Sequence, residues 1–166
     1  MDRPVEIKAE ESPLVEIFRH NVWANLRLLD ACENLSEEQF QATVPGTFGT
    51  IRDTLMHIVL AERGYLSRTT GQPPAITLKR DEFPGIATLR ESVRLSGEGL
   101  AQVAARARST DIIGEEWQGR FYNIPVTIFL VQAINHATEH RTQVATILTQ
   151  LGIEPPSIDG WAYMEP

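Results

Sequence analysis

The residues in this sequence whose types and spacing could do chemistry are two histidines, His136 and His140, four positions apart. In a helix this spacing places both imidazoles on one face, with their Cβ atoms about 6 Å apart. Buried imidazoles need polar partners. The pair therefore indicates either two hydrogen-bonded core residues or two ligands of one metal ion, and the spacing alone does not decide between them. The apolar residues that share this face are Phe129, Ala133, Ala137, Val144, Ile147, Leu148 and Leu151.

A metal site in a helical core needs a further ligand from another segment. Four side chains are candidates: His20, Asp53, His57 and Glu62. We expect His20 to be exposed, because it lies off the apolar face of its own segment. Glu62 falls within the apolar stripe of residues 50–70, whereas His57 projects to the far side of that stripe. Helical periodicity therefore favours Glu62 and does not single out His57.

Four long segments with helical periodicity position these residues. The first begins at Ser12-Pro13, a capping residue followed by a proline at the first helical position, where the missing N–H costs nothing. The other three are predicted at 50–70, 86–107 and 125–151. The apolar stripe of the first is Leu14, Ile17, Phe18, Leu28, Leu29 and Cys32.

Shorter elements fill the gaps between these segments. Ser36 to Gln39 is predicted as a short turn, residues 116–122 as a hairpin turning at Gln118-Gly119, and residues 153–166 as an ordered loop. The pattern predicts an all-α fold, an antiparallel four-helix bundle with a short hairpin or irregular segment before the last helix. We expect one domain over residues 1–166, with its core at about 12–152 and a C-terminal tail at 153–166.

Composition narrows the function classes. The net charge of −7, from 15 Lys+Arg and 22 Asp+Glu, opposes binding to phosphate backbones, so we expect no nucleic-acid partner. No basic amphipathic stretch or long apolar run indicates a membrane. Cys32 is the single cysteine, which excludes an internal disulfide and a cysteine-rich zinc site. Met1 to Glu6 lacks the pattern of a signal peptide, and we expect a cytoplasmic protein.

Several other polar or aromatic residues have a structural and a functional interpretation. Asn21 and Asn25 lie in the apolar stripe of the first helix and either hydrogen-bond other helices or support a metal-bound histidine. Trp23, on the polar side, is a candidate contact of a homodimer. Arg141 and Gln143 project away from the histidine face, which favours structural roles.

Motifs spread along the chain resemble the DinB-like family. They are Asn21-x-Trp23-Ala24-Asn25-x-x-Leu28-Leu29, then Gly46-Thr47-Phe48-Gly49-Thr50-Ile51-Arg52-Asp53-Thr54-Leu55-x-His57, then Asn135-His136-x-x-x-His140-Arg141-x-Gln143, and Pro155-Pro156-x-x-Asp159-x-x-x-Tyr163. The similarity spans about residues 14 to 163, and the joint order of the motifs is more specific than any one of them.

The resemblance implies a divalent metal ion at one end of an antiparallel four-helix bundle, with His57, His136 and His140 as its ligands. It thereby chooses His57 where periodicity does not. Glu139 stands where some relatives have another histidine, a departure that leaves the triad intact. Some members of the larger family use such a metal to activate low-molecular-weight thiols in transferase or isomerase reactions.

Three neutral imidazoles leave coordination positions open for water or substrate, whereas a structural zinc site normally has four protein ligands. They suit Zn, Ni, Fe or Cu. The first hypothesis is a metal-dependent enzyme acting on a small-molecule substrate, a thiol-dependent S-transferase or isomerase, with metal-dependent hydrolysis as the competing chemistry. The second is a non-catalytic, metal-stabilised stress-response or binding module. No general base beside the triad can be named from the sequence, so the catalytic residues stay unknown.

Overall fold

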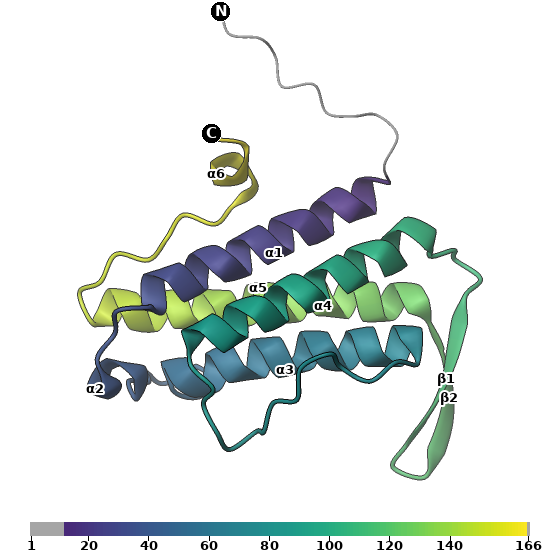
Figure 1. The fold of residues 1–166 in the computed structure, drawn as a ribbon, viewed down its shortest axis with the longest axis horizontal. Helices are drawn as coiled ribbons and strands as arrows, with labels where there is room; N and C mark the ends of the chain where they lie inside the picture. The colour runs from purple at the N-terminus through teal and green to yellow at the C-terminus, as the bar shows by residue number, and fades with distance from the viewer. Residues whose placement is uncertain (1–11, 166) are drawn as a thin grey trace, which may run out of the picture.

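The computed structural model describes residues 12–165, which form a mostly helical fold with a small two-stranded sheet (Figure 1). The expectation about a signal peptide falls on residues outside this range. The helices are α1 (Pro13–Cys32), α2 (Glu37–Phe40), α3 (Ile51–Thr70), α4 (Ile86–Arg106), α5 (Val126–Gln150) and α6 (Gly160–Met164). The strands are β1 (Ile112–Trp117) and β2 (Arg120–Pro125).

Local sequence signals account for where the long helices begin and end. Pro13 opens α1 behind Ser12, whose hydroxyl accepts a hydrogen bond from the backbone N–H of Leu14. At α3, Thr50 and Asp53 form a reciprocal capping box, and Gly71 ends the helix with a φ of +70°. The Asp53 carboxylate therefore hydrogen-bonds the backbone at the start of α3.

The four long helices lie side by side and share a core (Figure 1). α1 and α3 each pack against both α4 and α5, so α3 presents two faces to neighbours. α1 and α4 approach so closely that a Cβ added at Gly97 would lie 2.0 Å from Cγ2 of Val22. The core divides into a larger cluster around Leu55, Val93 and Val144 and a smaller one around Phe18 and Leu100.

The hairpin predicted before the last long helix, α5, is confirmed, with Trp117 paired to Arg120 and the turn at Gln118-Gly119. Both turn residues have positive φ, +51° and +73°, as a tight two-residue hairpin requires. Other details of the prediction were wrong. Leu14 and Ile17 are 39% and 45% exposed, because Val15 rather than either of them turns inward at the start of α1. The predicted tail loop contains α6, which Asp159 caps.

Within residues 12–165, no helix is both long and apolar enough to span a bilayer.

Candidate metal centre

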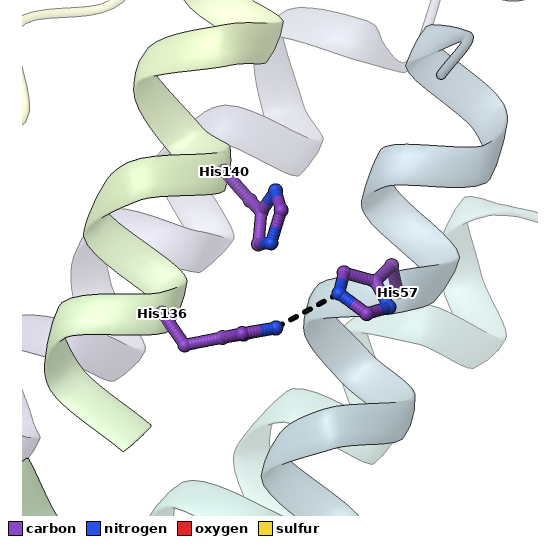
Figure 2. Close-up of side chains that lie close together, drawn as sticks. All are labelled: His57, His136 and His140. Atoms are coloured by element: carbon purple, nitrogen blue, oxygen red, sulfur yellow. Dashed lines mark hydrogen bonds between the residues drawn. The ribbon is translucent and has the colours of Figure 1, made fainter. Parts of the chain in front are cut away.

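Three histidines from two neighbouring helices converge between α3 and α5 (Figure 2). His57 projects from α3 toward His136 and His140 on α5, and Nε2 of His57 lies 2.8 Å from Nε2 of His136. The ring centroids of the three imidazoles are 4.4 to 4.6 Å apart. One nitrogen from each ring lies within 4.8 Å of the other two. The structure thus brings together the three histidines that the family resemblance selects.

The separation of the nitrogens suits a single ion. Metal–nitrogen bonds of about 2.0–2.1 Å place two nitrogens on one ion at most about 4.2 Å apart. The spread of 4.8 Å or less among the three ligand atoms is within a small side-chain rotation of that limit. No other group of three or more His, Cys, Asp or Glu side chains converges in this way in the part of the chain that the structure describes.

The charge state of the imidazoles also suits a cation. Burial lowers the pKa of His136 to about 4, and the neighbouring His140 and His57 oppose a further positive charge there. The pKa of His57 is lowered by burial, by His140 and by Arg80. Both rings are therefore neutral at neutral pH, the form that binds metal. Nδ1 of His136 is buried and has no hydrogen-bond partner among residues 12–165.

Gln143 selects the tautomer of His140, a role that sequence reasoning missed. Its Oε1 accepts a hydrogen bond from the backbone N–H of Phe48 at 3.0 Å, and Nδ1 of His140 lies 2.9 Å from the same oxygen. Because the Phe48 amide can only donate, the Gln143 atom is an acceptor, and Nδ1 of His140 carries the proton. The Nε2 lone pair of His140 is left free for a metal. The signal that could have indicated this role is the spacing of three between His140 and Gln143.

Phe48 forms one wall of the cluster. Its ring stacks on His57, with centroids 4.0 Å apart and planes 11° apart, and meets His140 edge-on at 5.3 Å. Phe48 is 51% exposed, so this wall is open to solvent on its outer side. The loop between α2 and α3 therefore contributes to the site through both the ring and the backbone of Phe48.

The remaining candidate ligands lie elsewhere. His20 was expected to be exposed, but it is half-buried, with Nε2 3.0 Å from the Ile158 carbonyl oxygen and its ring against Trp23 and Tyr163. The tail folds over α1 and covers this side chain, which no helical pattern could show. Trp23 is half-buried for the same reason.

Glu62 is buried but does not reach the histidine cluster. Its Oε1 accepts hydrogen bonds from Nδ2 of Asn21 at 2.6 Å and of Asn25 at 2.8 Å. Nη1 of Arg141 donates in turn to the side-chain oxygens of both asparagines, at 2.6 and 2.8 Å. Burial raises the pKa of Glu62. The prediction that Asn21 and Asn25 hydrogen-bond other helices is confirmed, and Arg141 has the structural role expected of it.

Comparison with known proteins agrees with this fold. The sequence model of the DinB family matches residues 3–166. Protein DinB of Bacillus subtilis (strain 168) is 20% identical over 158 residues, which cover 90% of this chain and 92% of that protein. A crystal structure of a DinB-like protein from Bacillus cereus ATCC 10987 has a TM-score of 0.66 at 24% identity and covers 87% of this chain and 94% of its own. With its family model matched over nearly its whole length, this chain belongs to the DinB family.

Proposed function

We propose that the protein binds one divalent transition-metal ion, Zn, Ni or Fe, through His57, His136 and His140. The observation that carries the proposal is the convergence of three imidazoles, one nitrogen from each within 4.8 Å of the others, at the contact of α3 and α5. We place this centre in an antiparallel four-helix bundle of α1, α3, α4 and α5, an arrangement that their side-by-side packing supports.

We further propose that the centre is the active site of a metal-dependent enzyme acting on a small molecule. Among residues 12–165 no fourth His, Cys, Asp or Glu joins the triad, which leaves coordination positions for an external ligand. When bound, the metal would acidify a coordinated thiol or water. Gln143 would hold His140 in the ligating tautomer, and Phe48 would hold the ring of His57. A thiol-dependent S-transferase or isomerase is the reaction class we favour, and metal-dependent hydrolysis is the alternative.

Cobalt substitution tests whether the centre is open. Co(II) loaded into the protein should show visible absorption that changes when a small thiol is added, with a new sulfur-to-metal charge-transfer band. His136→Ala should lose both the bound cobalt and the band. His20→Ala should keep both, because His20 lies beside Trp23 and Tyr163, away from the triad. A spectrum that stays insensitive to thiol, azide and cyanide while cobalt remains bound would exclude catalysis at the ion.

A non-catalytic, metal-stabilised module with a stress-response or binding role is the second candidate. One observation favours it: two cavities of about 690 and 260 Å³ are present among the described residues, and none of the three histidines lines either of them. A thiol-dependent transfer assay on the metal-loaded protein separates the two candidates. The homodimer and the cytoplasmic location stay predictions.

A further inference from the structure

A second candidate site, which none of the three histidines lines, lies between α3, α4 and the segment that follows α3. It is a cavity of about 260 Å³. The segment after α3 runs back along α3 and α4 (Figure 1), and the carbonyl oxygen of Ile76 accepts a hydrogen bond from Arg63 of α3. The polar side chains among its lining residues are Arg63, Ser67, Thr70, Gln72, Ser92 and Ser96.

Among residues 12–165, Arg63 is a buried cation without an anionic partner. Its residue is 8% exposed. Among residues 12–165 its guanidinium group makes no ion pair, and its hydrogen bond to Ile76 uses one of five N–H donors. Buried charges in proteins are almost always paired. By contrast, the guanidinium group of Arg141, which is also buried, donates hydrogen bonds to three side chains, those of Asn21, Asn25 and Thr138. Burial lowers the pKa of Arg63.

Ser92, which also lines this cavity, has a hydroxyl group without a hydrogen-bond partner among residues 12–165. It is 2% exposed, and its Oγ is buried with no hydrogen-bond partner in the part of the chain that the structure describes. The neighbouring Ser96 already donates to the backbone oxygen of Ser92 at 2.9 Å. A buried hydroxyl without a partner carries a free-energy cost that a ligand could remove. Within residues 12–165, one cavity is therefore lined by a guanidinium that has no ion pair and by a serine whose hydroxyl has no hydrogen bond.

We propose that this cavity binds a small organic monocarboxylate, with its carboxylate at Arg63 and Ser92 and its apolar part against the neighbouring side chains. A guanidinium and a hydroxyl are both donors, which an oxyanion needs. The apolar lining, which includes Leu66, Pro73 and Leu95, suits a hydrocarbon chain. Arg63 is the one cationic side chain in the lining of the cavity, and the chain as a whole has a net charge of −7. Both facts favour a singly charged ligand over a phosphate dianion. The site is independent of the metal centre.

Binding of butyrate, followed by NMR, tests the proposal. Saturable shifts should appear at the Arg63 side-chain N–H and at backbone amides of α3 and α4 beside the cavity. Butyramide, the uncharged analogue, should cause none, and inorganic phosphate should bind more weakly than butyrate. Arg63→Gln should weaken butyrate binding by about tenfold or more, because a charge-assisted hydrogen bond is lost.

Matched variants separate binding in this cavity from binding elsewhere on the protein. Arg68→Gln removes an exposed guanidinium from the same helix and should leave butyrate binding unchanged. His136→Ala should also leave it unchanged, and loss of binding there would place the anion at the histidines and overturn the proposal. If Arg63→Gln does not fold, Ser92→Ala decides, since it should fold and weaken binding. Unsaturable shifts, butyrate affinity that is the same in all variants, or tighter binding of phosphate would each overturn the assignment.

Discussion

At the scale of single residues, the proposed metal centre depends on which imidazole nitrogens carry protons. The backbone of Phe48 orients the Gln143 amide, and that amide orients His140. Such a chain of donors and acceptors prepares a ligand before any ion arrives, and the metal then does not have to displace a proton from the ligating nitrogen. The burial that keeps His57 and His136 neutral has the same effect.

Replacing Gln143 should therefore weaken metal binding without removing a ligand. In Gln143→Ala, Nδ1 of His140 loses its acceptor, and the ring is free to rotate or change tautomer. We expect metal affinity to fall by about 10- to 100-fold, the usual range for residues that orient a ligand. Competition with a chromophoric chelator measures it. Gln132→Ala, at an exposed position of the same helix, is the control. Equal affinities in the two variants would contradict the role of Gln143.

The lowered histidine pKa values also predict how stability depends on pH. The pKa of a histidine in an unfolded chain is about 6.5, whereas burial and the neighbouring histidines lower the pKa of His136 in the fold to about 4. Between these values the unfolded chain binds more protons, so the free energy of unfolding of metal-free protein should fall as pH drops from about 6.5 toward 4. Urea unfolding at several pH values measures this. In His136→Ala the dependence should be shallower, and a dependence as steep as the parent's would refute the assignment.

At the scale of helices, a buried polar network holds α1, α3 and α5 together. Glu62 from α3 and Arg141 from α5 form no direct ion pair but hydrogen-bond the same two asparagines of α1. Arg141 directly follows His140 in the chain, and Glu62 lies on the same helix as His57. The network therefore sets the relative position of the two helices that carry the histidines.

Breaking this network should destabilise the fold. Arg141→Met keeps the apolar stem of the side chain but leaves the side-chain oxygens of Asn21 and Asn25 without their donor. We expect a loss of at least about 2 kcal/mol in the free energy of unfolding, because buried acceptors are left unpaired. Denaturant titration measures it. Arg27→Met, on the exposed side of α1, should cost no more than about 0.5 kcal/mol. Similar losses in the two variants would contradict the importance of the network.

Local features of these helices could be predicted from the sequence, and features set by neighbours could not. The cap at Ser12, the start of the second long helix near residue 50 and the turn at Gln118-Gly119 depend on adjacent residues and are confirmed. Periodicity preferred Glu62 to His57 because it describes one buried face per helix, whereas α3 packs against both α4 and α5. Glu62 can lie in the core because the side-chain amides of Asn21 and Asn25 donate hydrogen bonds to its carboxylate. These partners come from another helix, so the sequence pattern around Glu62 does not reveal them.

At the scale of the whole molecule, metal binding should raise stability, because the unfolded chain has no assembled triad. With free ion at about 100 times its dissociation constant, the gain should be about 2.7 kcal/mol. Thermal unfolding with and without metal measures it, and metal analysis should find one ion per chain. His57→Ala should lose the gain. His20→Ala should retain it, even if its lost contacts with Trp23 and Tyr163 lower the baseline. If metal still stabilised the His57→Ala variant to the same extent, His57 would be excluded as a ligand.

The separation of the histidines along the chain has a consequence for when the centre can form in a cell. His57 and His136 are 79 residues apart, so a ribosome making about 5–20 residues per second needs roughly 4–16 s to go from one to the other. During that interval the emerging polypeptide offers an ion only one of the three nitrogens. A nascent chain therefore cannot capture metal through this triad as it leaves the ribosome. Loading of the proposed centre is therefore expected to follow translation of α5, in competition with other completed proteins for the ion.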